Sequence, residues 1–298
     1  MENNKVKDYG LVSVIMPTYR QKELLYKAVE SVLNQSYKKV ELIVIDDNKE
    51  ESFKIDNAEY FSKLNSDKVV YISNEQNLGS TGSRNKGIFK ASGDYVTFLD
   101  DDDVYAPFKI EKQLAQMIEQ NADVSVCNLI LTNENGKITD CRKRKYLTKK
   151  EPLIVKHFKY HITGTDTMMF KRQFIQDIGG FGNQDLGDEF YLMLKALEKN
   201  PVFAHVDYNG VYAVVHSQTG LSSGENKIKT EDFLWNFIMA YDYPFKKIDV
   251  RYMGMRHKLV LAIAYKKNRK YFKCLSFLLK AFFTHPFGMF RILTGKDR

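Results

Sequence analysis

Short apolar runs of strand length alternate with helical patterns over the first hundred residues. The runs at 11–16, 40–45, 69–72 and 95–99 are rich in β-branched residues and carry apolar side chains on both faces. Strands that are apolar on both faces and separated by helices are typical of a mostly parallel sheet with helices on either side. We therefore predict a doubly wound α/β fold for this part of the chain.

The chain changes character towards its end. A helical pattern at 107–120 and a strand pattern at 124–131 continue the α/β alternation, whereas helical patterns dominate from residue 230 onward. We expect an α/β domain over residues 1–224 and a largely helical C-terminal appendage over residues 225–298. No apolar run approaches the roughly 18–20 residues that a membrane-spanning helix needs.

Charge is distributed unevenly along the chain. The 298 residues carry a formal net charge of +8, but the segment from Phe245 to Arg298 holds 14 basic and only two acidic residues. The first 244 residues are therefore slightly acidic. A basic appendage predicts contact with an anionic partner, and the two classes to consider are a membrane surface and nucleic acid.

The cysteines and the first ten residues bear on location. Cys127, Cys141 and Cys274 show neither disulfide-type nor metal-type spacing. The polar N-terminal stretch lacks the apolar core of a signal peptide. We expect a reducing, cytoplasmic setting, with the inner face of the plasma membrane as a candidate peripheral location.

Polar residues gather directly after three of the predicted strands, at 17–19, 46–48 and 100–103. In open parallel sheets, ligands bind in the crevice outside the carboxyl ends of the strands. We therefore expect the three loops to converge on one site.

Four consecutive aspartates, Asp100 to Asp103, are the most informative feature of these loops. Adjacent carboxylates repel one another, so such a run needs a cation or strong hydrogen-bond donors nearby. In an extended segment Asp100 and Asp102 point to the same side, and their hard oxygen ligands favour Mg²⁺ or Mn²⁺ bridging to substrate phosphates. The alternative is that Asp103 caps the helix expected near Pro107.

Several motifs together resemble one enzyme family. They are VSVIMPTY at 12–19, ELIVIDD at 41–47, NLG at 77–79, SRNKG at 83–87 and GDYVTFLDDDD at 93–103. In order and spacing this set resembles the family 2 glycosyltransferases of GT-A fold, over about residues 11–222. The resemblance implies an inverting enzyme that uses a UDP-sugar, of the type that builds bacterial cell-surface polysaccharides.

The resemblance implies nucleotide contacts in the first two loops and in the helix after the third strand. Pro17, Thr18 and Tyr19 would lie along the nucleoside, with the Tyr19 ring available to stack on the base. Asp47 would accept a hydrogen bond from uracil N3, and Arg84 would contact the nucleotide. Structural alternatives are a turn at Asp47, a solvated surface charge at Arg84, and filling of the core edge by Tyr19.

The resemblance also implies a metal site. Asp102 would be a direct ligand of Mn²⁺ or Mg²⁺, with Asp101 or Asp100 near the ribose. His216 would coordinate the metal or contact the diphosphate, and a structural histidine is the alternative. Asp166 is a candidate contact to the donor sugar or the acceptor, and equally a loop carboxylate with its hydrogen bonds satisfied.

Inverting transfer to a hydroxyl requires a base that takes the acceptor proton. Members of the family place this carboxylate before a helix, often as Glu-Asp, and here the order in Asp188-Glu189 is reversed. Alignment on the apolar helix favours Glu189, whereas an aspartate at the helix start favours Asp188, which we prefer. Capping of the helix by this pair is the structural alternative. The predicted mechanism is a single displacement without a covalent enzyme intermediate.

The expected acceptor is a hydroxyl group of a glycan or a lipid-linked glycan, and the expected donor sugar is a hexose or an N-acetylhexosamine. Residues 271–283 form a basic amphipathic helical pattern. This pattern predicts either contact with an anionic membrane surface or packing against protein, including a second copy in a homo-oligomer.

Other functional classes compete with a glycosyltransferase. A catalytically silent scaffold could keep the sugar-nucleotide fold. A nucleic-acid-binding protein would suit the basic tail, but the chain has no recognised nucleic-acid motif and carboxylate-rich loops repel phosphate, so we expect no nucleic-acid partner. A nucleotidyltransferase is disfavoured because no glycine-rich phosphate loop follows the first strand.

Overall fold

The computed structural model describes residues 9–182, 187–215 and 224–295. Contacts divide the chain into two compact units, which we call the N-terminal and the C-terminal unit. The N-terminal unit comprises Met1–Lys143 and Thr163–Val215, and the C-terminal unit comprises Arg144–Ile162 and His216–Arg298. The division into separable domains at residue 224 remains a prediction.

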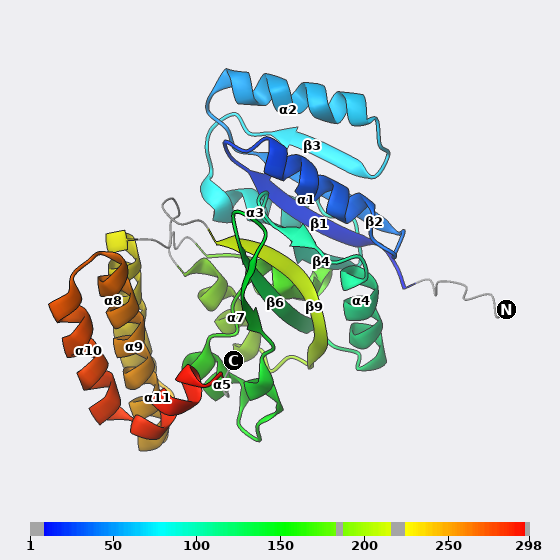
Figure 1. Cartoon of the computed structure of the whole chain (residues 1–298). Helices are drawn as coiled ribbons and strands as arrows, with labels where there is room; N and C mark the ends of the chain where they lie inside the picture. Colours follow the sequence, from blue (N-terminus) through cyan, green and yellow to red (C-terminus); the bar gives the residue numbers. More distant parts are fainter. Residues whose placement is uncertain (1–8, 183–186, 216–223, 296–298) are drawn as a thin grey trace. The chain divides into compact units, whose positions relative to one another are not determined.

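One nine-stranded sheet forms the centre of the N-terminal unit, in the order β3-β2-β1-β4-β8-β6-β9-β5 with β7 on β6 (Figure 1). The strands are β1 Val12–Thr18, β2 Val40–Asp46, β3 Val69–Ser73, β4 Tyr95–Phe98, β5 Val104–Tyr105, β6 Val124–Asn133, β7 Ile138–Arg142, β8 Met168–Lys171 and β9 Phe203–Val215. Strands β1 to β4 pair in parallel, as do β6 and β9. The pairs made by β5, β7 and β8 are antiparallel. The predicted parallel sheet is confirmed, and antiparallel strands extend it.

Helices cover both faces of this sheet. They are α1 Glu23–Leu33, α2 Glu51–Leu64, α3 Gly79–Lys90, α4 Lys109–Glu119, α6 Arg172–Asp177 and α7 Asp188–Glu198. The alternation of side chains along β1 explains why both faces need a cover. Val12, Val14 and Met16 pack into one core with residues of α1 and α4, whereas Ile15 points to the opposite face of the sheet. There α3 lies so close that a Cβ added at Gly87 would collide with Ile15 Cγ2. The doubly wound arrangement is confirmed.

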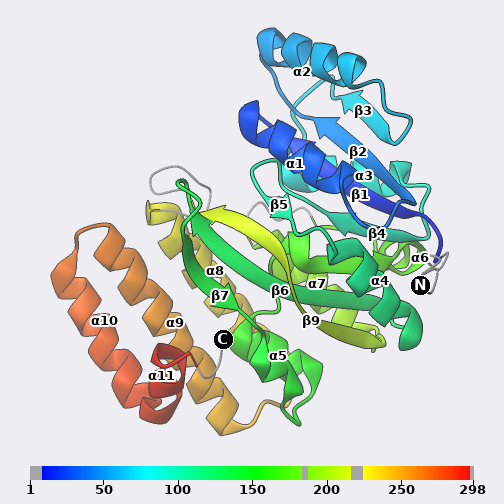
Figure 2. The same ribbon diagram turned by 45° about the vertical axis from the view of Figure 1, so that its right-hand side comes forward.

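The C-terminal unit is helical. It contains the short 3-10 helix η1 Lys145–Thr148 and the helices α5 Leu153–Tyr160, α8 Gly224–Ala240, α9 Lys247–Lys267, α10 Tyr271–Thr284 and α11 Pro286–Leu293. Helix α9 packs against the other four α-helices of the unit (Figure 2). Its buried Tyr252, Met255 and Leu259 form a small core with Ala281 of α10. Within the described ranges, no helix combines the length and apolar composition needed to cross a membrane.

Candidate active site

The loops that follow β1, β2 and β4 meet at one edge of the sheet. Thr18 at the end of β1 pairs with Asp46 at the end of β2, and the Asp47 N–H donates to the Thr18 carbonyl oxygen at 2.9 Å. From the next loop, the Asp101 carboxylate accepts a hydrogen bond from the Tyr19 N–H at 3.0 Å. The predicted convergence of the three loops is confirmed.

The two adjacent aspartates after β2 have different surroundings, and Asp46 is the structural one. Its fully buried carboxylate accepts four hydrogen bonds of 2.6–2.9 Å, two from Asn48, one from Asn57 and one from the Tyr71 hydroxyl. A buried carboxylate with this many donors stabilises the loop that it ends. No role was predicted for Asp46 from the sequence, whereas the family resemblance implied a nucleotide contact for Asp47 alone.

Asp47 is also buried, but only one of its oxygens is bonded. Its Oδ1 accepts hydrogen bonds from Asn74 Nδ2 at 2.7 Å and from the Leu78 N–H at 2.8 Å. Its Oδ2 has no protein partner among the described residues. Asp47 therefore presents one carboxylate oxygen in a fixed orientation, which a turn residue would not need.

The predicted nucleoside contacts at the end of β1 differ in exposure. Pro17 and Thr18 belong to the strand, and Thr18 is buried. Tyr19 is 41% exposed, and the guanidinium carbon of Arg20 lies 5.0 Å from the centre of its ring. The Tyr19 ring therefore does not fill the core edge. Its stacking on a base remains a prediction.

Arg84 on α3 joins two carboxylates, and we call these three residues the Arg84 centre. Its Nη1 donates to Asp188 at 2.9 Å and its Nη2 to Asp100 at 2.6 Å. Burial disfavours the charged guanidinium, but the attraction of the two carboxylates outweighs burial and raises the pKa of Arg84. Its Nε is buried without a hydrogen-bond partner among the described residues. Arg84 is a fixed internal cation rather than a solvated surface charge.

Two further carboxylates lie beside the Arg84 centre. Oxygen atoms of Asp100, Asp103 and Asp166 all lie within 4.8 Å of one another. Burial and the neighbouring carboxylates raise the pKa of Asp103 to about 7 and the pKa of Asp166 well above its usual value. This carboxylate cluster offers oxygen ligands in excess of the local positive charge, so its residues fit a hard divalent cation such as Mg²⁺ or Mn²⁺.

The carboxylate cluster contains residues for which the sequence predicted other roles. Asp103, considered as a helix cap, accepts a hydrogen bond from the Val214 N–H at 2.9 Å, and α4 begins only at Lys109. Asp166, considered as a sugar contact, is a member of the cluster. Asp102 is not one of its three members and remains a predicted ligand, and His216 lies outside the described residues.

Asp101 contacts the loop that follows β1. Its carboxylate accepts a hydrogen bond from the Tyr19 N–H, and burial raises its pKa to about 7. Asp101 thus orients the loop that follows β1. Its expected place near a ribose remains a prediction.

The two candidate bases at the start of α7 face different partners. Asp188 accepts its hydrogen bond from Arg84, and burial raises its pKa. Glu189 Oε2 instead accepts hydrogen bonds from the Gly164 N–H at 3.2 Å and the Thr165 hydroxyl at 3.3 Å. Asp188 is therefore part of the charged site, whereas Glu189 anchors the loop before the short 3-10 helix η2 Thr165–Thr167.

Sequence analysis missed the buried cation Lys109. Its Nζ donates to the Thr97 hydroxyl at 2.5 Å and lies 4.1 Å from the centre of the Tyr105 ring. Burial lowers its pKa to about 8. The missed signal is its position one turn before Gln113 on the buried stripe of α4.

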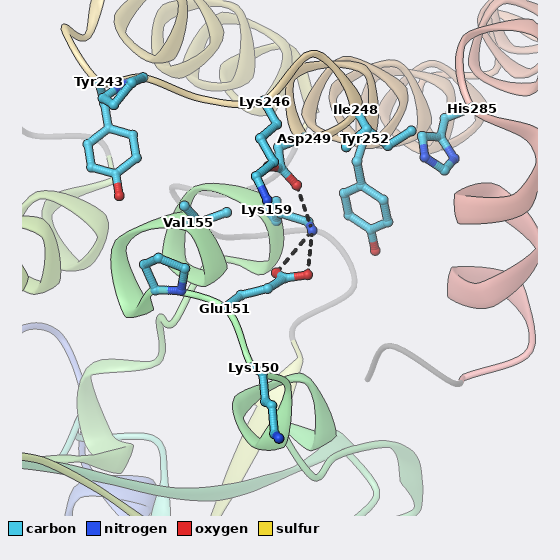
Figure 3. Close-up of a pocket in the computed structure, with 12 residues that line it drawn as sticks. Lys150, Glu151, Val155, Lys159, Tyr243, Lys246, Ile248, Asp249, Tyr252 and His285 are labelled. Carbon is cyan, nitrogen blue, oxygen red and sulfur yellow. Dashed lines mark hydrogen bonds and ion pairs between the residues drawn. The ribbon is translucent and has the colours of Figure 1, made fainter.

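In the C-terminal unit, the buried cation Lys159 also lies between two carboxylates (Figure 3). Its Nζ lies 3.0 Å from both carboxylate oxygens of Glu151 and 2.9 Å from Asp249 Oδ1. We call these three residues the Lys159 centre. They line a cavity of about 430 Å³ together with two further lysines, Lys150 and Lys246. Carboxylates and cations are thus more evenly matched here than around Arg84.

Comparison with known proteins gives consistent matches. The family model described as glycosyl transferase family 2 matches residues 13–179. A Methanocaldococcus jannaschii protein named as an uncharacterized glycosyltransferase is 36% identical over 181 residues, which cover 57% of this chain and 59% of that protein. WfgD of Escherichia coli is 33% identical over 129 residues, which cover 43% of this chain and 49% of WfgD. The chain spans about half the length of the curated relatives that it matches.

Among solved structures, TarS of S. aureus has a similar fold. Its residues 1–349 in complex with UDP-GlcNAc align with a TM-score of 0.57 at 20% sequence identity, covering 88% of this chain and 73% of that one. This likeness confirms the GT-A fold. Since the family model also matches more than half of the sequence, the chain belongs to glycosyl transferase family 2.

Proposed function

We propose that this protein transfers a sugar from a UDP-sugar to a hydroxyl group of a glycan or a lipid-linked glycan, with inversion. One observation carries the proposal: a single buried guanidinium, Arg84, is outnumbered by the carboxylates around it, at the strand ends where an α/β sheet binds its ligand. Such an acidic excess repels a diphosphate unless a metal ion intervenes. The fit of the carboxylate cluster to a hard cation supports metal dependence.

The residues that would hold the cation are Asp100, Asp103 and Asp166, with Asp102 as a further predicted ligand. When bound, Mn²⁺ or Mg²⁺ supplies positive charge beside the diphosphate of the leaving nucleotide. Two of the three cluster residues, Asp103 and Asp166, are buried. Their protonation in the metal-free protein therefore competes with metal binding.

Residues of the first two loops would bind the nucleotide. Asp47 Oδ2 is the bonding partner proposed for uracil N3–H, and its orientation by Asn74 and Leu78 supports this role. The exposed Tyr19 ring would stack on the base beside Pro17. TarS, which was solved with UDP and with UDP-GlcNAc, supports a uridine nucleotide by its fold.

Asp188 is the proposed base. It would take the proton of the acceptor hydroxyl while that oxygen attacks the anomeric carbon, in one displacement. The raised pKa of Asp188 makes it a stronger base, and Arg84 holds its carboxylate in place. Glu189 is less suited, because Oε2 is engaged with the loop at Gly164.

The proposed donor sugar is a hexose or an N-acetylhexosamine, and the proposed acceptor lies in cell-surface polysaccharide synthesis. WfgD is named as a glucosyltransferase that uses UDP-Glc and a GlcNAc-diphosphoundecaprenol acceptor. Its similarity supports a lipid-linked acceptor for this chain too. An acceptor of that kind would place the reaction at a membrane surface.

Titration calorimetry with UDP tests the nucleotide and metal assignments together. We expect UDP to bind well with Mn²⁺ and at least about tenfold more weakly with EDTA, because the acidic site then repels the diphosphate. Asp47→Asn and Asp103→Asn should each weaken binding with Mn²⁺, whereas Asp249→Asn in the Lys159 centre should not.

UDP binding that is unaffected by EDTA contradicts metal dependence, and no UDP binding in either buffer contradicts the proposed function. A second measurement excludes a silent scaffold. Incubation with UDP-glucose, UDP-galactose, UDP-GlcNAc or UDP-GalNAc should release the sugar from at least one donor. Binding without release from any donor would support the scaffold.

A further inference from the structure

Helix α10 turns apolar side chains outward. Its inner side is formed by Ala281, which is fully buried, and by the half-buried Phe277 and Leu278. Its outer side carries Phe272, which is 94% exposed, and Phe283, which is 75% exposed. A helix on the surface of a protein in water normally turns polar residues outward, so this face is adapted to a different environment.

The next helix, α11, extends the same property. Phe287, Phe290 and Leu293 recur at helical spacing, and all three are exposed. We call the exposed apolar residues of both helices the apolar face. Its members are Tyr271, Phe272, Leu275, Leu279, Phe282, Phe283, Phe287, Phe290 and Leu293. Nine exposed apolar residues on two consecutive helices mark an interaction surface.

Basic residues precede and accompany the apolar face. Four of them, Lys266, Lys267, Arg269 and Lys270, lie at the turn before α10 and are exposed, and α10 itself carries Lys273 and Lys280. The sequence contains no acidic residue between Asp249 and Asp297. All charged side chains of residues 250–296, which include α10 and α11, are therefore basic or histidine.

We propose that α10 and α11 bind an anionic lipid surface, with the apolar face in the interface and the basic residues at the headgroups. At 14 residues, α10 is about 21 Å long, which is too short to span a bilayer and suited to lying along it. Basic residues beside an apolar helix face are complementary to anionic headgroups. The apolar face belongs to the C-terminal unit and the Arg84 centre to the N-terminal unit, so lipid binding can be measured without turnover.

The charge also argues against the main alternative, a second copy of the chain. Two copies joined by the same face about a twofold axis would bring two sets of basic residues together without an acidic residue between 250 and 295 to pair with them. An anionic lipid surface buries the same apolar residues and attracts the same charges.

Vesicle sedimentation of the full chain tests the proposal. We expect the protein to sediment with vesicles of phosphatidylcholine and phosphatidylglycerol, more weakly with phosphatidylcholine alone, and more weakly at high salt. The double variant Phe272→Ser with Phe283→Ser should lose affinity for the mixed vesicles about tenfold or more. The matched control is Phe89→Ser, an 80% exposed phenylalanine on α3, which should bind as the wild type does.

A second variant keeps the test independent of folding. Replacing Lys266, Lys267 and Arg269 by Gln removes charge and no apolar contact, and it should abolish the preference for phosphatidylglycerol. Equal sedimentation of wild type and double variant overturns the proposal. So does a wild-type dimer, measured by light scattering, that the double variant loses while neither protein binds vesicles, because the apolar face would then join two copies.

Discussion

Each unit buries a cation between two carboxylates, yet the two centres differ in what surrounds them. Around Lys159, further lysines line the same cavity, and the charges are close to balanced. Around Arg84, the surplus consists of further carboxylates, Asp103 and Asp166. A balanced centre is complete in the protein alone, whereas an acidic surplus leaves a charge that a ligand must neutralise. The comparison therefore supports our proposal that the Arg84 centre, and not the Lys159 centre, is the site of chemistry.

The largest expected effect concerns the base. Asp188→Asn should lower kcat by about 10²- to 10⁴-fold while UDP affinity changes little, because the amide cannot accept the acceptor proton. Steady-state kinetics with the preferred donor measures it. Asp249→Asn, the matched change in the Lys159 centre, should leave kcat within about twofold of wild type. If Glu189→Gln abolishes transfer and Asp188→Asn does not, Glu189 is the base.

The next effect compares the two cations themselves. Arg84→Met leaves a surplus of buried carboxylates and should lower the free energy of unfolding by about 3–5 kcal/mol. Lys159→Met should cost less, about 1–3 kcal/mol, because Lys150 and Lys246 line the same cavity and partly neutralise the two carboxylates that remain. Urea denaturation measures both.

Addition of Mn²⁺ extends the comparison of these two variants. It should stabilise wild type and Lys159→Met equally, because both keep the carboxylate cluster and Arg84. It should stabilise Arg84→Met more, because loss of the guanidinium leaves the cluster more negative and strengthens its affinity for the ion. Equal stabilisation of both variants by Mn²⁺ would show that loss of Arg84 does not increase the affinity of the carboxylate cluster for the ion.

The smallest expected effect concerns Lys109, a buried cation to which no carboxylate of the described residues is hydrogen-bonded. Lys109→Met should raise the free energy of unfolding at pH 7 by about 1–2 kcal/mol, because burial of the ammonium is unfavourable. Its pKa is about 8 in the folded protein against an ordinary 10.5. Between these values the unfolded chain binds more protons, so wild-type stability rises with pH.

The advantage of Lys109→Met should therefore shrink from pH 8 to pH 10.5. Urea denaturation of both proteins at pH 7 and at pH 10 measures this change. A difference that stays constant with pH would mean that Lys109 is not the titrating group.

The pattern of apolar residues along the sequence was sufficient to predict β1 to β4. The runs that became β1 to β4 are apolar on both faces, and parallel order brings their carboxyl ends together, so the positions of Asp47 and Asp101 could be expected from sequence. The order of parallel strands is also what made the three polar loops one site. Sequence reasoning succeeded where neighbouring elements are close in the chain.

The rest of the site depends on pairing between distant segments. Asp166 reaches Asp100 because the short strand β8 pairs antiparallel with β4, about 70 residues earlier in the chain. Asp103 is held by Val214 of β9. Neither contact leaves a periodic signal in the sequence. Residues 144–162, including α5, were not expected to share a unit with the C-terminal helices for the same reason.

Gly87 gives the close approach of α3 to β1 a further meaning. A Cβ added at this position would clash with Ile15 Cγ2 and lie 3.1 Å from Ile15 Cγ1. The backbone of α3 therefore packs directly against the side chain of Ile15. Arg84 lies one turn earlier on the same helix. The lack of a side chain at Gly87 therefore fixes the distance between α3 and β1, and with it the position of the Arg84 guanidinium relative to the aspartates. A larger residue at position 87 would move α3 away from β1 and change the distances between Arg84 and its carboxylates, although no charged residue would be substituted.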